Sequence, residues 1–157
     1  MTEVRIITAG DPTTQQLEQF KKYASVPDCS TDAMLFQILK RSMLEVQEFS
    51  DRAVLPCTLE LTAYDVLVGD ELRLYQGGRI VTSIVDAEGE SVDHYTKGGR
   101  VKVMQNAETL TITYSNLVDP TEVERLLPVC YELGTAIYDG EEADKQASIL
   151  KKLYWAL

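Results

Sequence analysis

The chain has 157 residues, of which 45% are hydrophobic and 25% are charged, and its formal charge is −10. This size and composition are typical of one globular domain with a continuous core, and no apolar run approaches the roughly 20 residues that cross a bilayer. The negative charge argues against a protein that holds nucleic acid by its phosphates, because such proteins need clustered Lys and Arg.

The first half of the chain predicts two helices, at residues 13–24 and 31–52. Ser30 is a suitable N-cap for the second. Its apolar positions recur with helical spacing and predict one buried face, formed by Leu35, Ile38, Leu39, Ser42, Val46 and Phe49. Gln47 falls on the opposite, charged face with Lys40, Arg41, Glu45 and Glu48.

From about residue 57 to 115 the apolar period changes to two, which predicts strands. The alternating segments include CTLELTAY, RIVTSIVD and TLTITYS, and glycine-rich or Asn-containing turns separate them. This spacing predicts an antiparallel meander. GGR occurs at 77–79 and at 98–100, each time before a strand, so both segments read as hairpin turns with two isolated arginines.

The last part predicts two more helices, at residues 119–139 and 141–155. Asp119 is the expected N-cap and Pro120 the first helical residue. Pro128 predicts either a kink or a helix that begins nearer to Leu127. Gly134 is small enough to let another helix pack closely. The order of elements predicts a single α+β domain over residues 1–157, with helices from both ends packed together and a central antiparallel β-sheet insertion.

The sequence offers little for catalysis. His94 is the only histidine, and Asp93 beside it would point to the opposite face of a strand. No G-x-S-x-G motif or metal-binding spacing occurs, and the acidic run at 139–144 reads as a solvated helix entry. We therefore expect no catalytic, cofactor-binding or metal site, and three reduced thiols with two in or near the core, namely Cys29, Cys57 and Cys130. The alternative is a small cytosolic enzyme or ligand-binding protein with a groove near His94 or the acidic run.

The C-terminal segment combines leucines with aromatic residues. Aromatic side chains that carry a polar group are favoured at protein interfaces. Two interpretations are equally good: the terminal helix packs its side chains on its own core, or it offers them to a partner. The candidate interface residues are Leu150, Leu153, Tyr154, Trp155 and Leu157.

From Thr31 to the C-terminus the chain resembles the head–tail connector (adaptor) proteins of tailed bacteriophages. The resemblance rests on EFSDRAVLPCTLEL, LRLYQGGRIVTSIVDAEGESVD, TLTITYSNLVDPTEVERLLPVCYELGTAIYDG and the closing ASILKKLYWAL. The chain departs from the family at Gly77-Gly78, where a proline-rich turn is common, and at 114–117, where the usual glycine is missing.

The resemblance implies a structural virion protein without catalysis or cofactor. Such proteins are made in the host bacterial cytoplasm and form rings, commonly dodecamers, at the head–tail interface. The ring docks on the portal protein through a surface to which the C-terminal residues would belong, and it seats the next neck or tail component. DNA passes through the lumen without specific binding, no membrane is involved, and an acidic wall repels phosphates. The stretch Asp51 to Asp65 would then be a corner between helix and sheet. Another neck-completion ring would fit the same pattern.

Overall fold

The computed structural model describes residues 1–26 and 32–156, with the side chains of residues 155 and 156 left out. The chain divides into two compact units. The β unit comprises Met1–Gly10 and Pro56–Leu117, and the helical unit comprises Asp11–Leu55 and Val118–Leu157. Cys29, the expected N-cap Ser30, and Leu157 lie outside the described residues. The single domain predicted for residues 1–157 stays a prediction.

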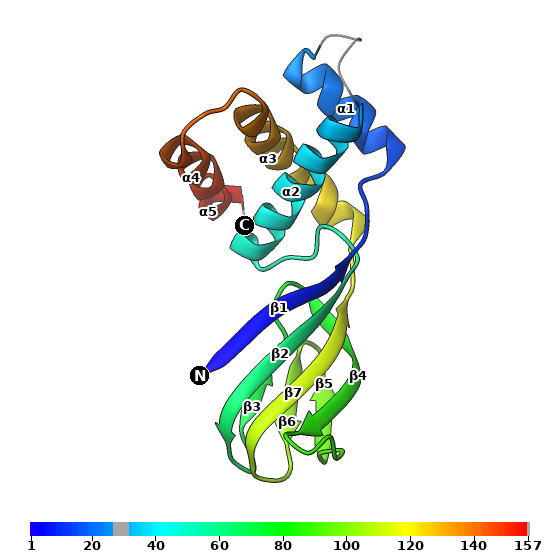
Figure 1. Cartoon of the computed structure of the whole chain (residues 1–157), viewed down its shortest axis with the longest axis vertical. Helices are drawn as coiled ribbons and strands as arrows, with labels where there is room; N and C mark the ends of the chain where they lie inside the picture. The colour runs from blue at the N-terminus through cyan, green and yellow to red at the C-terminus, as the bar shows by residue number, and fades with distance from the viewer. Residues whose placement is uncertain (27–31, 157) are drawn as a thin grey trace. The chain divides into compact units, whose positions relative to one another are not determined.

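The helical unit joins helices from both ends of the chain, as the sequence predicts (Figure 1). Observed and predicted bounds differ by one or two residues, except that the last predicted helix is divided into two near Lys152. Across the described residues, none of the helices has the length and apolar character needed to span a membrane. The helices are α1 (Thr14–Ala24), α2 (Asp32–Ser50), α3 (Pro120–Tyr138), α4 (Ala143–Lys151) and α5 (Leu153–Ala156).

Local capping sets where the helices begin. At α1, Thr13 and Gln16 form a reciprocal capping box. At α3, the Asp119 carboxylate accepts a hydrogen bond from the Thr121 amide at 3.0 Å, with proline at the first helical position, which confirms the predicted cap. α3 then continues through Pro128, so the alternative start near Leu127 is wrong.

Close packing of α1 on α3 explains the glycine in α3. Phe20 is fully buried and stacks on Tyr131, with 6.1 Å between the ring centroids. A Cβ atom at Gly134 would lie 2.8 Å from the Phe20 ring, which is closer than real carbon atoms approach. Any residue other than glycine at position 134 would clash with the Phe20 ring, so the prediction that Gly134 allows close helix packing is confirmed.

The buried face of α2 differs from the predicted one at several positions, of which Phe49 and Gln47 matter most: Met43 and Ser50 are also buried, and Ile38 is only partly buried. Phe49, expected in the core, is 38% exposed, whereas Gln47, expected on the charged face, is fully buried. The helix ends at Ser50, Asp51 adopts a positive φ of 56°, and the chain folds back over Gln47. The Gln47 Oε1 atom accepts hydrogen bonds from the Val54 and Leu55 amides at 2.9 and 3.0 Å. Residues 51–55 therefore form a hydrogen-bonded corner.

The β unit contains two antiparallel sheets (Figure 1). The strand order is β1-β2-β7-β4 in the first sheet and β3-β6-β5 in the second, so the predicted meander is wrong although every pairing is antiparallel. The sequence did not predict strand β1, because the apolar run at this position is short. The strands are β1 (Thr2–Ala9), β2 (Cys57–Val66), β3 (Glu71–Arg73), β4 (Gly78–Asp86), β5 (His94–Lys97), β6 (Arg100–Val103) and β7 (Ala107–Asn116).

Buried and more exposed residues alternate along the strands, as the period-two pattern of the sequence predicts. Both sheets bury one face, and the buried side chains include Leu59, Leu61, Ala63, Val101, Val103, Leu110, Ile112 and Tyr114. At the end of β7, the buried Asn116 side chain accepts a hydrogen bond from the Cys57 amide at 2.8 Å, which fixes the start of β2. The opposite faces carry mostly polar side chains and are available for contacts with other molecules.

Candidate interaction site

The helical unit separates the predicted C-terminal interface residues into buried and exposed side chains. Leu153 is fully buried and belongs to the core. Leu150 is partly exposed at the end of α4, and Tyr154 in α5 is 72% exposed. The side chain of Trp155 and the whole of Leu157 lie outside the described residues. Leu153 thus anchors the short helix that presents Tyr154 to solvent.

Tyr154 contacts an aromatic residue that the sequence placed in the core. Its ring meets Phe49 of α2 edge to face, with 5.4 Å between centroids and 62° between planes. This geometry is favourable for an aromatic pair. At the same end of the unit, Lys152 pairs with Glu132 of α3, which ties the α4–α5 segment to its neighbour. We call Phe49, Leu150 and Tyr154 the aromatic patch.

A hollow of about 400 Å³ adjoins this patch, lined by Glu45, Glu48, Phe49 and Leu150. Its floor is apolar and two carboxylates flank it. Glu45 is already paired with Arg41 at 3.0 Å, one helical turn away. Such a site suits an apolar side chain from a partner that also carries Lys or Arg, since apolar contact and opposite charge would act together.

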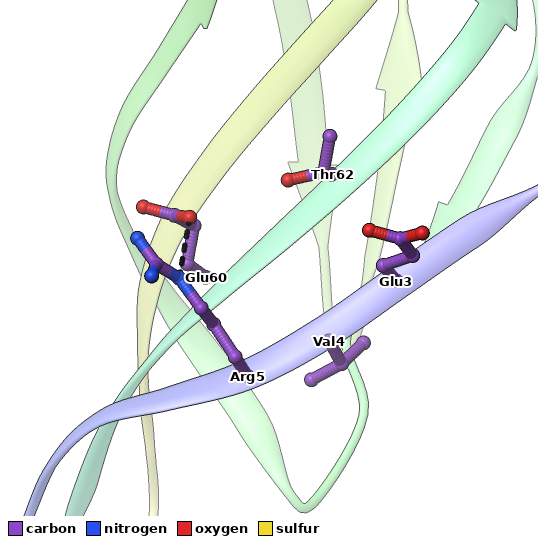
Figure 2. A pocket seen from close by; sticks show the side chains of 5 residues that line it. All are labelled: Glu3, Val4, Arg5, Glu60 and Thr62. Atoms are coloured by element: carbon purple, nitrogen blue, oxygen red, sulfur yellow. Dashed lines mark hydrogen bonds and ion pairs between the residues drawn. The ribbon is translucent and has the colours of Figure 1, made fainter.

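A second hollow, of about 360 Å³, lies on the outer face of β1 and β2. Figure 2 shows Arg5 of β1 reaching across to Glu60 of β2. Arg5 Nε donates a hydrogen bond to Glu60 Oε1 at 2.9 Å, and this bond with the attraction between the charges raises the pKa of Arg5. The hollow therefore contains a surface ion pair between Arg5 and Glu60. Its other lining residues are Glu3, Val4 and Thr62.

The alternative site near His94 lies away from both hollows. His94 is exposed at the start of β5, and its Nδ1 atom lies 2.9 Å from the Val92 carbonyl oxygen. It lines neither hollow. The acidic run begins α4, where Glu141 pairs with Lys145 at 2.7 Å and raises the lysine pKa. His94 and Glu141 thus each have a local partner within a few residues of the sequence.

Two of the three cysteines are buried free thiols, as expected. Burial raises the pKa of Cys130 to about 12, so its thiol stays protonated and unreactive at neutral pH. Cys57 is also buried, at the start of β2. Within residues 1–26 and 32–156, His, Cys, Asp and Glu side chains form no group of three or more that could hold a metal ion.

Comparisons with known proteins identify solved structures with a similar fold. No family model matches the sequence, and no curated protein matches it. A chain from the neck of an empty gene transfer agent (GTA) particle, computed with C6 symmetry, is similar in structure with a TM-score of 0.62 and 15% identity, over 87% of this chain and 84% of that one. A chain from the virion of a native GTA particle has a TM-score of 0.62 and 14% identity, over 95% and 93% of the two chains.

At such low sequence identities, the comparisons show that the folds are similar and no more. It covers both units, and the α+β architecture expected from the sequence is confirmed. The likeness also agrees with the resemblance to head–tail connector proteins. Sequence reasoning missed Phe49 and its two flanking carboxylates as site residues. The signal in the sequence was the position of Phe49 in the last turn of an amphipathic helix. At such a position, a small change in where the helix ends moves a residue from the core to the surface.

Proposed function

We propose that this chain is a structural protein of a virion neck, specifically a head–tail adaptor. It forms a homo-oligomeric ring, a dodecamer, which docks on the portal protein and seats the next neck or tail protein. DNA passes through its lumen, and the chain performs no catalysis. The observation that carries the proposal is the fold shared with a chain from a GTA virion over 95% of this chain and 93% of that one.

The distribution of exposed apolar side chains supports an assembling protein. Large apolar side chains in both units are at least half exposed, including Leu67, Val68, Tyr95, Leu117 and Tyr154. Each subunit of a ring needs two different surfaces that contact its neighbours, and further surfaces for the components above and below. Exposed apolar residues in both units are what such a subunit requires.

We assign portal docking to the aromatic patch. Phe49 and Tyr154 present ring faces and edges beside a hollow that can take one apolar side chain. Aromatic residues in or beside a pocket are the usual source of binding energy in protein interfaces. The flanking Glu45 and Glu48 select a portal segment in which Lys or Arg accompanies the apolar residue.

The ring is tested by co-expression with the portal protein of the same genome. Native mass spectrometry and electron microscopy of the purified complex should find a ring of this chain seated on the portal. The portal must be present, because a subunit of this kind can be monomeric alone. Only monomers of this chain beside intact portal rings would refute the proposal.

The docking surface is tested by the double variant Phe49→Ser, Tyr154→Ser. We expect at least a tenfold loss of portal affinity with little change in Tm, because both side chains are exposed. Tyr64→Ser in the β unit, where the ring is 39% exposed, is the matched control and should bind normally. Leu153→Ser should instead lower Tm, because that side chain is buried. A double variant that docks as well as the parent would reassign the docking surface and leave the ring proposal standing.

A further inference from the structure

Five of the six cations of the β unit lie close together. Its residues 1–10 and 56–117 contain six Lys and Arg, and Arg5 is the one that lies on β1. The other five lie on or beside the sheet β3-β6-β5, around the turn that joins β5 to β6. We call these five the cation cluster: Arg73, Arg79, Lys97, Arg100 and Lys102.

Strand register places three of these cations side by side. Arg100 of β6 pairs with Arg73 of β3 on one side and with Lys97 of β5 on the other. Paired residues of neighbouring strands point to the same face of a sheet. The next outward row contains Glu71, Lys102 and Tyr95, all exposed. The outer face of this sheet therefore carries four cations against a single carboxylate.

Arg79 joins the cluster from the other sheet. A Cβ atom at Gly99 would lie 2.5 Å from an Arg79 guanidinium nitrogen, so the glycine leaves the space that this guanidinium occupies. Gly99 directly precedes Arg100. The guanidinium of the first GGR segment therefore lies beside the second GGR segment, next to the residue that precedes Arg100.

Among the described residues, three cations of the cluster, Lys97, Arg100 and Lys102, have at most a weak ionic partner. Like charges opposite each other on a sheet are destabilising. Arg100 lies 4.0 Å from Glu71, and both side chains are more than half exposed, so this contact is weak. In the part of the chain that the structure describes, Lys97 and Lys102 make no ion pair. A chain of charge −10 therefore presents concentrated positive charge on one sheet face, an arrangement suited to an anionic ligand.

The composition of the face distinguishes between two anionic ligands. The core of a protein interface is depleted of charged residues and of Lys in particular. Interfaces with DNA are more polar and much more positive. Apart from Tyr95, which is 61% exposed, the outward positions of the three strands are all charged. We propose that the cation cluster binds the phosphate backbone of duplex DNA. The contact is independent of base sequence, because cations on a sheet face reach phosphates and read no base edges.

This inference stands apart from the ring and its portal contact, and its test needs neither. The full-length protein is titrated onto a labelled duplex of about 30 base pairs, with fluorescence anisotropy measured at about 20 to 150 mM salt. The triple variant Arg73→Gln, Lys97→Gln, Arg100→Gln should bind at least tenfold more weakly. The slope of log K against log salt should fall by about three, since roughly 0.9 counterions are released per phosphate contact.

A control with the same charge change tests the location. Arg5→Gln, Lys22→Gln, Lys151→Gln removes three cations outside the cluster and should leave both affinity and salt slope at wild-type values. Tm of the cluster variant should equal or exceed that of the wild type, because removing like-charge repulsion does not unfold a sheet. The proposal is overturned if the wild type fails to bind at 20 mM salt, if both triple variants bind equally, or if polyglutamate of equal charge competes as well as DNA, which would assign the cluster to an acidic protein surface.

Discussion

Replacing Gln47 with an apolar residue tests whether its side chain organises the hydrogen-bonded corner at residues 51–55. Gln47 is fully buried, and its Oε1 atom accepts from the Val54 and Leu55 amides. Both residues are 2% exposed, so water cannot replace a lost acceptor. An unsatisfied buried donor costs about 1–3 kcal/mol, and Gln47→Leu creates two. Removing the amide group of Gln47 from the core offsets part of this, so we expect a net loss of about 2–4 kcal/mol.

Urea unfolding followed by circular dichroism measures this loss, and thermal unfolding should give a Tm lower by about 6–12 °C. Amide hydrogen exchange gives a local reading, and the Val54 and Leu55 amides should exchange at least tenfold faster. Gln47→Met, which keeps the length of the side chain but offers only a weakly accepting sulfur, should behave like the leucine variant. Glu48→Leu is the exposed neighbour and should change stability by less than about 0.5 kcal/mol. The reasoning is refuted if both Gln47 variants are as stable as the parent with those two amides still protected.

Three further changes address other parts of the molecule. Gly134→Val should destabilise by about 1–3 kcal/mol, because a side chain there meets the Phe20 ring, and Phe20→Leu should recover part of the loss in a double-mutant cycle. Arg100→Gln should stabilise the β unit by about 0.2–1 kcal/mol in low salt by removing repulsion from Lys97, and an unchanged urea midpoint would contradict this. The pKa of Cys130 is raised from 9.0 to about 12, so the folded state binds more protons between these values and its stability should fall as pH rises from about 9 to 12, with Cys130→Ala showing a flatter profile by urea titration.

Features set by neighbouring residues were predictable from sequence. The cap at Asp119 and the alternation of Leu59, Leu61 and Ala63 depend on side chains a few positions apart, and the structure has them where expected. Gln47 was misassigned for the opposite reason. Helical spacing puts it among charged residues, but its environment is decided by the corner after Ser50, where the chain folds back over the helix.

Pairing between distant segments was also beyond the sequence patterns. No strand was predicted at β1, because its sequence lacks clean alternation and is followed by a turn. Its identity as a strand comes from pairing with β2, where Val4 faces Leu61 and Ile6 faces Leu59. The same holds for the aromatic patch. Tyr154 was predicted to be an interface candidate from its chemistry alone, whereas its partner Phe49 lies in another helix and becomes visible only when the helices pack.

The cation cluster shows why net charge is a weak guide to local chemistry. The formal charge of −10 is a sum over the chain, and taken alone it predicts no phosphate binding. At physiological salt, however, charges act over about 8 Å, so a ligand is affected by the side chains it touches and little by the remainder. Sheet register places Arg73 and Lys97 each within that range of Arg100, although the three residues come from three different strands. An acidic protein can therefore repel DNA over most of its surface and still hold the backbone at one face, which would suit the ring that we propose.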